Sequence, residues 1–270
     1  RNFLPVSVST NVMLVMSARA WVNLCQHLLS HSLREANALG EAIRLELELA
    51  APRLLKHAVA KDSMREGLTF EGEEVRALAA QIGELKEAPS NPLLEVFPPS
   101  GAGDFSRDLQ FHDNRYAWIG AQLRRTAVRF GWGAVGLAEI RDLNRHRTGT
   151  KWCPLVPQGF YAALDQCPQN ESAAHETLQE LELLGRRFSQ RALELLRASE
   201  DSYVYWLLLG TQLPFEHTTT ADKFIYEAEL RTGTGAHYRY AEHLREVLAL
   251  WYEKYPATRG LVLEGSAEPE

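Results

Sequence analysis

Apolar residues recur at the spacing of an amphipathic helix over most of this chain, and that spacing limits the folds it can adopt. From Ser17 onward the apolar positions are Trp21, Leu24, Leu28, Leu39, Ile43 and Leu47, which follow the period of a helix with one buried face. Further helices are predicted over residues 70–86, 134–144, 173–198, 202–209, 220–232 and 235–254. The β-branched stretch 6–15 predicts an extended start. The expected class is α+β, mostly helical.

A proline-rich segment interrupts this helical pattern. Residues 88–103 contain four prolines together with serine and glycine, a composition typical of a linker or domain boundary. The chain has 270 residues, enough for one large domain or two modest ones. We therefore predict two parts, 1–100 and 101–270.

Composition excludes several classes of function. The net charge is −6 with acids and bases intermixed, which disfavours binding to a nucleic-acid polymer but allows a small anionic ligand. No apolar run is long enough to cross a membrane, and no signal peptide is visible. Three scattered cysteines form neither a zinc pattern nor a disulfide framework, so a cytoplasmic protein is expected. The first residue is Arg1 and not methionine, so we expect further chain upstream.

Two distant parts of the chain can be aligned with each other. Leu4-Pro5 and Leu213-Pro214 each open a segment that leads into a helix. The two helices align from Ala18 and Ala221, with these further pairs: Trp21 with Phe224, and Ala38 with Ala241. The hypothesis is that residues 1–60 and 213–256 share one local fold, related by a pseudo-twofold axis. The alternative is a chance match of two amphipathic helices.

The tripeptide Arg145-His146-Arg147 is the strongest candidate for a binding site. It ends a helical run and is followed by Thr148-Gly149-Thr150-Lys151, so guanidinium forks, hydroxyls and backbone N–H groups lie close together. Such a cluster suits a phosphate or another planar anion. The alternative is a solvated basic helix end, which the helix dipole favours.

A second candidate is Arg231, where one helix ends and a glycine-containing turn, Thr232 to Gly235, precedes the next. An arginine at such a break can face a cleft, or it can satisfy the last carbonyl groups of its own helix. His27 and His31 stand four residues apart, a spacing that can bind a metal, but no third ligand is evident. No metal is therefore expected.

These stretches together resemble the flavin-dependent thymidylate synthase family. The family signature is Arg-His-Arg, two residues, Ser, one residue, Asn-Glu, one residue, Ser, one residue, Arg-Tyr. Arg145-His146-Arg147 matches it, and Thr150 replaces the first serine. The remaining signature positions depart from the family, being Trp152, Cys153, Leu155, Pro157 and Gln158.

The later half of the family pattern is found twice, and each copy keeps a different part. The family has Leu-Pro, a strand, Asn-Ala-Arg, a helix ending in Leu-Arg, a break, and Ala-Gln before a long helix. Leu4-Pro5 precedes Ser17-Ala18-Arg19 at the family spacing, but Leu28 falls at the position of the uracil-contacting arginine. In the second copy Leu230-Arg231 matches, whereas Thr220-Ala221-Asp222 replaces Asn-Ala-Arg. The resemblance implies tandem thymidylate synthase-like halves.

The resemblance also implies an activity: methylation of dUMP, or a related uracil nucleotide, using methylenetetrahydrofolate, NADPH and a bound FAD. It assigns FAD binding to Arg145, His146, Arg147 and Arg19. It assigns nucleotide binding to Thr150 and Arg231, with Arg231 polarising the uracil ring as the catalytic residue. The family builds its sites across subunits, so a homo-oligomer is expected. Two alternatives stay open: an inactive relative that binds nucleotides or acts as a scaffold, and an unrelated helical protein with a chance Arg-His-Arg.

Overall fold

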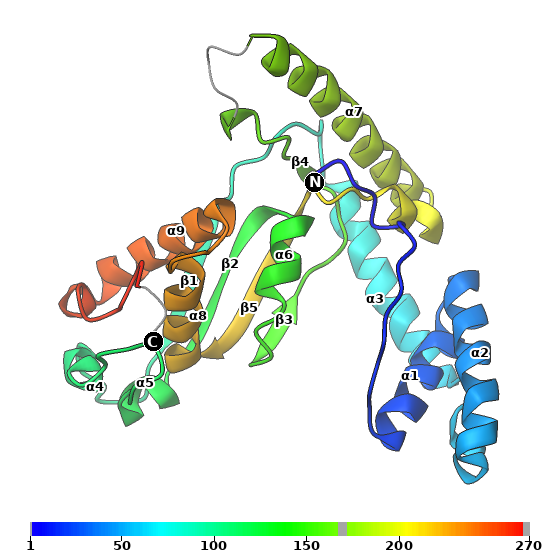
Figure 1. The fold of residues 1–270 in the computed structure, drawn as a ribbon, viewed down its shortest axis with the longest axis horizontal. Helices are drawn as coiled ribbons and strands as arrows, with labels where there is room; N and C mark the ends of the chain where they lie inside the picture. Colours follow the sequence, from blue (N-terminus) through cyan, green and yellow to red (C-terminus); the bar gives the residue numbers. More distant parts are fainter. Residues whose placement is uncertain (1, 167–171, 267–270) are drawn as a thin grey trace. The chain divides into compact units, whose positions relative to one another are not determined.

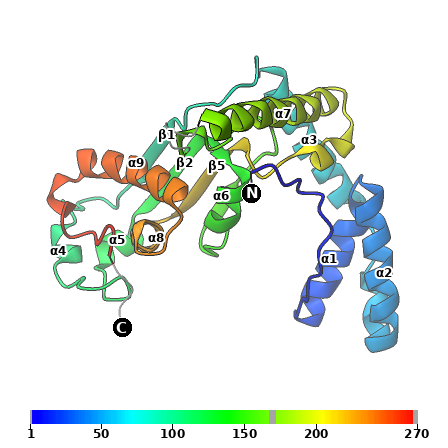
Figure 2. The same ribbon diagram turned by 45° about the horizontal axis from the view of Figure 1, so that its top comes forward.

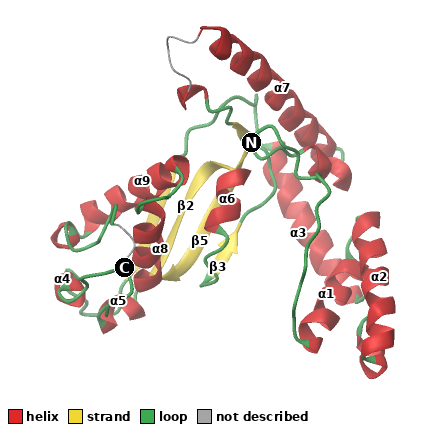
Figure 3. Ribbon diagram, in the orientation of Figure 1, coloured by secondary structure: helices red, strands yellow, loops and turns green. Residues whose placement is uncertain are grey.

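The computed structural model describes residues 2–166 and 172–266. It has many helices and a small antiparallel sheet, which confirms the predicted α+β, mostly helical class (Figure 3). The chain forms two compact units. Unit 1 is made of the described residues within 1–3, 85–186 and 208–270, and unit 2 of 4–84 and 187–207. Along the chain, the unit boundary nearest to the predicted division at residue 100 lies between Glu84 and Leu85. The predicted parts 1–100 and 101–270 are sequence repeats and not compact units, so their division stays a prediction.

Unit 1 is built on an antiparallel sheet with strand order β1-β2-β5-β3, to which β4 adds by pairing with β5 (Figure 1). The strands are β1 (Pro92–Phe97), β2 (Ala127–Gly136), β3 (Thr150–Trp152), β4 (Gly159–Phe160) and β5 (Thr211–Thr220). Strand β1 lies inside the segment expected to be a linker. Its proline, Pro92, is the first residue of an edge strand, one of the few sheet positions that tolerate a missing N–H group.

A β-bulge in β2 explains how proline fits into the central strand β5. Trp132 pairs with Phe215 and Val135 pairs with Leu213, so Gly133 and Ala134 together face Pro214. Pro214 has no N–H to donate to β2. The N–H groups of Gly133 and Ala134 instead donate to the carbonyl oxygen of Ser90, at 2.7 and 3.3 Å.

Two helices, α8 (Ala221–Thr232) and α9 (Tyr238–Lys254), pack against this sheet (Figure 2). Their contact builds the main core, whose largest members are Phe130, Trp132, Phe215, Phe224 and Trp251. Helix α8 is buried on nearly all sides, and its buried residues include Glu227 and Glu229. Short helices α4 (Ser106–Leu109), α5 (Ala121–Arg125) and α6 (Leu137–Leu143) complete the region around the sheet.

Unit 2 is helical. It contains α1 (Ala18–Ser30), α2 (Arg34–Ala50), the 3-10 helices η1 (Pro52–His57) and η3 (Asp201–Trp206), α3 (Asp62–Ala80) and the end of α7 (Ser172–Arg197). Ser17 is the N-cap of α1, and its hydroxyl accepts the Ala20 N–H at 3.3 Å. The core of α1 and α2 is small: Cys25, Leu47 and Ala58, with Trp21, Leu29 and Ile43 beside them.

The stretch 6–15, expected to be extended, forms no strand, because no described strand lies beside it to complete a ladder. Two local expectations are wrong. The helix predicted from Ser17 is broken between Ser30 and Arg34, where the Asn37 amide donates to the carbonyl oxygens of Leu28 and His31. Residues 202–209 form the short η3 instead of an α-helix.

The pseudo-twofold relation between residues 1–60 and 213–256 stays a prediction. No helix among the described residues is long and apolar enough to span a membrane.

Candidate functional site

A cavity of about 850 Å³ in unit 1, which we call the cationic cavity, brings together most of the predicted site residues. Three segments form it: the loop 115–119 with Arg124, the turn after α6, and the outer face of α8. Its lining includes six cationic side chains, Arg115, Arg124, Arg145, Arg147, Lys223 and Arg231. Asp222 is the single carboxylate among the lining residues. The cavity therefore suits an anion.

The turn after α6 presents Arg145, His146 and Arg147. Helix α6 ends at Leu143, and the N–H of His146 donates to the Leu143 carbonyl at 3.3 Å. The two arginine side chains are exposed, whereas His146 is buried between them. Gly149 closes the turn with φ +65°, and a Cβ at that position would lie 2.0 Å from the Thr218 carbonyl oxygen. Only glycine fits this turn into β3.

Arg231 reaches the same cavity from the last turn of α8. Its Nε donates to Nε2 of His146 at 2.8 Å, and Nη2 donates to the Asp142 carbonyl at 2.9 Å. Its guanidinium carbon lies 5.4 Å from the centre of the Tyr240 ring. These contacts fix the plane of the guanidinium group at the cavity wall, which preorganises the remaining donors for a ligand.

A buried chain of polar groups supports these residues from behind. Glu227 lies 3.9 Å from Nδ1 of His146 and 3.0 Å from Nδ1 of His217, and its side chain is fully buried. Nε2 of His217 donates to the Thr148 carbonyl oxygen at 2.6 Å. The carboxylate of α8 and the histidine of β5 therefore hold the turn that carries the Arg-His-Arg tripeptide.

His146 is neutral in this arrangement. Burial lowers its pKa to about 4, with Glu227 opposing and the Arg231 charge reinforcing the shift. The geometry agrees, because Nε2 must carry a lone pair to accept the Arg231 N–H. His146 thus acts as a hydrogen-bond acceptor that orients Arg231, and the cations facing the cavity are arginines and lysine.

Aromatic rings lie among the cations. Tyr116, Trp118 and Tyr226 line the cavity, and the ring centres of Tyr116 and Tyr226 are 6.0 Å apart. Tyr226 also contacts the His146 ring edge-on at 6.3 Å. Flat, partly exposed rings beside arginines can stack on a base or another planar ring system.

Two predicted residues lie elsewhere. Thr150 begins β3 and is exposed, and Thr148, two residues earlier, lines the cavity instead. Arg19 is exposed on α1 in unit 2. The roles given to these residues by the family resemblance stay predictions, as do the roles of Arg145, His146, Arg147 and Arg231.

Sequence reasoning missed several members of the site. Lys223 and Glu227 precede the predicted Arg231 at intervals of four residues and share one face of α8 with it, which is a signal that could have been found. Arg115 and Arg124 come from irregular or short segments, where no periodicity marks the face that a side chain takes. His217 could be recognised only from the register of β5 against its neighbours.

Among the described residues, no group of three or more histidine, cysteine, aspartate or glutamate side chains could hold a metal ion. Cys25 and Cys153 are free thiols. Burial raises the pKa of Cys153 to about 11, so the nucleophilic thiolate form is disfavoured there.

Comparisons with known proteins give matches among the solved structures alone. No protein-family model matches the chain, and no curated protein matches it. One of the similar solved structures is a UMP/dUMP methylase, PolB, from Streptomyces cacaoi, bound with 5-Br UMP. The likeness has a TM-score of 0.48 and 14% sequence identity, and it covers 68% of this chain and 100% of that chain. At this level it assigns a role to no residue.

Proposed function

We propose that the cationic cavity binds a uracil nucleotide, and that the protein methylates dUMP or a related nucleotide in the manner of the flavin-dependent thymidylate synthases that its sequence resembles. One observation carries the proposal. Arg231 and His146 are 85 residues apart in sequence and are hydrogen-bonded at one cavity, which also contains Arg145 and Arg147. The two sequence stretches singled out by the resemblance meet there.

The charge of the cavity supports a phosphate ligand. Six cations against one carboxylate give a strong positive potential, and arginine forks match the geometry of phosphate oxygens. In this proposal Arg145 and Arg147 face the phosphate groups of the ligands. Arg231, held by His146 and the Asp142 carbonyl, directs its remaining donors at the uracil carbonyl oxygens, where negative charge develops as the ring is attacked.

The residues present also fit the FAD that the resemblance implies. A flavin dinucleotide needs cations for its diphosphate and a flat surface for its ring, and Arg145, Arg147 and Tyr226 offer both. When bound, the reduced flavin supplies a hydride. Methylenetetrahydrofolate as carbon donor and NADPH as reductant belong to the same proposal, as does a homo-oligomer. The chain itself binds and orients the nucleotide.

Calorimetric titration of dUMP and deoxyuridine into the same protein tests the binding step. dUMP should bind at least tenfold more tightly, because only it carries the phosphate. Arg231→Ala should weaken dUMP binding by roughly 10- to 150-fold, the loss of one or more hydrogen bonds to a charged group. Arg141→Ala is the control, because Arg141 is exposed on α6 and does not line the cavity. Equal affinity for dUMP and deoxyuridine would contradict the proposal.

Turnover separates the enzyme from an inactive nucleotide-binding relative. Incubation of the FAD-loaded protein with dUMP, methylenetetrahydrofolate and NADPH should yield dTMP, detected by mass as the added methyl group. Tight dUMP binding without any product would retain the nucleotide site and exclude the methyltransferase.

A further inference from the structure

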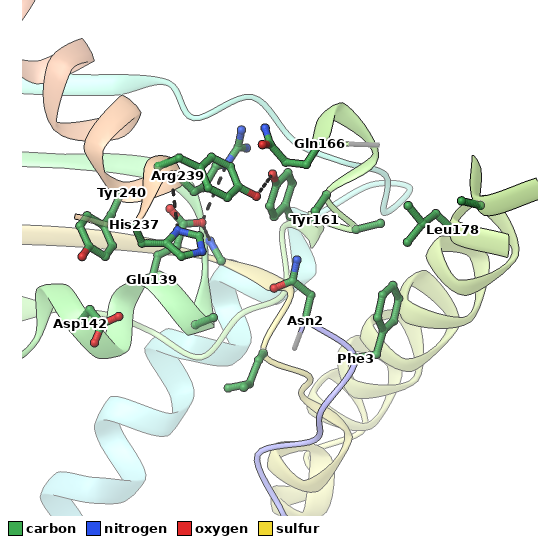
Figure 4. Close-up of a pocket in the computed structure, with 17 residues that line it drawn as sticks. Asn2, Phe3, Glu139, Asp142, Tyr161, Gln166, Leu178, His237, Arg239 and Tyr240 are labelled. Atoms are coloured by element: carbon green, nitrogen blue, oxygen red, sulfur yellow. Dashed lines mark hydrogen bonds and ion pairs between the residues drawn. The ribbon is translucent and has the colours of Figure 1, made fainter. Parts of the chain in front are cut away.

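A second cavity in unit 1, of about 500 Å³, has a different chemistry; we call it the tyrosine cavity (Figure 4). It is formed by the start of α6, the segment after β4, the start of α9 and the first half of α7, together with Asn2 and Phe3. Its apolar lining consists of Phe3, Ala138, Ala162, Ala163, Leu178 and Leu209, among others. The proposed function assigns it no ligand.

Aromatic and amide groups gather in this cavity. The hydroxyl of Tyr161 donates to Asp165 at 2.8 Å and lies 2.8 Å from the Tyr238 hydroxyl. Figure 4 shows the side chains of Gln166 and Asn2 on either side of Tyr161, with Phe3 and Leu178 farther toward α7. A carboxamide both donates and accepts hydrogen bonds. The lining therefore matches a flat ligand that also carries both kinds of group.

The charges around the cavity disfavour an anion. Among the described residues that line it, Arg239 is the one arginine or lysine, and Glu139 and Asp142 are carboxylates. Three carboxylates already surround the Arg239 guanidinium, Glu87 at 3.7 Å and Glu139 and Glu242 at 3.9 Å. An incoming anion would meet a net negative wall, in contrast with the cationic cavity.

The Arg239 guanidinium stacks on an aromatic ring, and one of its hydrogen-bond donors has no partner in the described part of the chain. Its guanidinium carbon lies 4.1 Å from the centre of the Tyr161 ring, which is a stacked cation–π contact. Its buried Nε has no hydrogen-bond partner among the described residues, since all three ion-pair distances exceed hydrogen-bond length. A buried donor without a partner costs free energy unless a ligand or water satisfies it.

We propose that the tyrosine cavity binds an uncharged, flat nitrogen heterocycle that carries an amide group. The face of the ligand packs against the rings of Tyr161 and Tyr238 and against the apolar wall. Its amide edge forms hydrogen bonds with the side chains of Asn2, Gln166 and Arg239. The inference stands on this cavity alone and does not require the proposed function of the cationic cavity.

Lining residues of this cavity contact Arg231, a lining residue of the cationic cavity. Asp142 lines the tyrosine cavity, and its backbone carbonyl accepts a hydrogen bond from Arg231, which lines the cationic cavity. Tyr240 lines the tyrosine cavity and lies under the same arginine. The two cavities, which have opposite electrostatic preference, are thus connected through single side chains.

Nicotinamide and nicotinate form a matched pair of probes, because they share ring and size and differ in charge. Saturation-transfer NMR should detect nicotinamide binding with a Kd on the order of 1 mM, as expected for so small a ligand. Nicotinate should bind at least tenfold more weakly. Equal signals from both probes, or stronger binding of nicotinate, would overturn the proposal.

Two substitutions that fill the cavity locate the bound probe. Leu178→Trp from α7 and Ala138→Leu from α6 should each abolish the nicotinamide signal, whereas Leu184→Trp, an exposed site on α7 outside the lining, should leave it unchanged. Because the two variants change different helices, one of them still tests the proposal if the other fails to fold. The dUMP titration reads the cationic cavity and the nicotinamide titration reads this one, so a failed nucleotide site and a failed tyrosine cavity give different results. A nicotinamide signal that survives both filling variants would place the probe elsewhere and contradict the inference.

Discussion

The two units contain the same order of elements, but the extended segment forms a strand in only one of them. In unit 1 an extended segment, β5, leads into α8, α9 and a short 3-10 helix, η4 (Pro256–Thr258). In unit 2 the extended stretch 6–15 leads into α1, α2 and η1. The helices are 12 and 17 residues long in the first case, and 13 and 17 in the second. Yet β5 is a central strand, whereas 6–15 is largely exposed and pairs with no described strand.

This difference shows that a partner strand decides whether a β-branched segment becomes a strand. Val12, Met13 and Val15 are 69%, 88% and 89% exposed, although their residue types favour β structure at least as much as those of β5. The burial of the following helix differs in the same way. Eight residues of α8 are buried, against three of α1. Only the helix that packs on a sheet carries the buried carboxylate and the arginine of the cationic cavity.

The largest expected effect comes from Gly131 in β2. A Cβ added there would lie 2.2 Å from the Phe215 carbonyl oxygen, so Gly131→Val should separate β2 from β5 and destabilise unit 1 by about 4 kcal/mol or more. Hydrogen exchange followed by mass spectrometry should show lost protection in both strands. Gly67→Val in α3 is the matched control, because that position has no neighbour within 4 Å. Unchanged protection of β5 would contradict this account of the sheet.

The next largest effect is a loss of stability at acidic pH, which comes from His146 in unit 1. The folded pKa of His146, about 4, lies below its usual value of 6.5, so as pH falls the unfolded chain takes up the proton first. Unit 1 should therefore lose about 3 kcal/mol of stability between pH 6.5 and 4. Burial also lowers the pKa of His31 in unit 2.

Proton NMR titration of the imidazole C–H signals measures both values. His146→Gln keeps a hydrogen-bond acceptor for Arg231 and removes the titrating group, so the low-pH transition should disappear from its spectrum and its stability should fall less steeply. A His146 signal that titrates near pH 6.5 would show that the ring is solvated and does not accept from Arg231.

A smaller effect is expected at the two helix starts. Ser17 caps α1 through its hydroxyl, so Ser17→Ala should destabilise α1 by about 1 kcal/mol. Thr220 begins α8 without a side-chain cap hydrogen bond, and its hydroxyl donates to Asp222 instead. Thr220→Ala should therefore leave the first N–H groups of α8 as protected as before. Equal loss of protection at both helix starts, measured by hydrogen exchange, would contradict this difference in capping.

The smallest effect is expected in the exposed stretch of unit 2. Val15→Lys should change stability by no more than about 0.5 kcal/mol, because the side chain makes little contact. Size-exclusion chromatography of the same variant adds a second readout. If wild type is an oligomer and Val15→Lys is a monomer, the stretch pairs with another chain, and the expectation of an isolated segment is wrong.

The sequence predicted the helices better than the sheet. Periodicity marked α7, α8 and α9 to within a few residues, because one apolar face is enough to specify an amphipathic helix. Strand β1 was missed because its prolines resemble a linker, and they are tolerated only at the strand start, Pro92, and beyond its end. The break after Ser30 depends on the Asn37 amide, which carries no periodic signal.

The candidate site was predicted in part for the same reason. Arg145, His146, Arg147 and Arg231 were found from short motifs, whose residues are adjacent or follow a helix end. Glu227 and His217 were not found, because their meeting depends on how α8 packs over β5. Arg115 reaches the site from a loop. Its guanidinium group also donates to the Ser266 carbonyl oxygen, and no local sequence pattern predicts that contact.

The bulge at Gly133 and Ala134 makes the site sensitive to insertions and deletions. Helix α6 begins directly after β2, with no loop between them to absorb a change in length. Removing one residue from the bulge would move the start of α6 by about 3.3 Å along β2 and invert the side-chain alternation of the strand residues that precede it. The Arg-His-Arg turn would then point away from Arg231, although the sequence would still contain every residue of the site. The same deletion in the loop before α4 would shift only an exposed connection. In a set of natural variants, chain length should therefore vary freely around residues 98–104 and stay constant between Trp132 and Arg147.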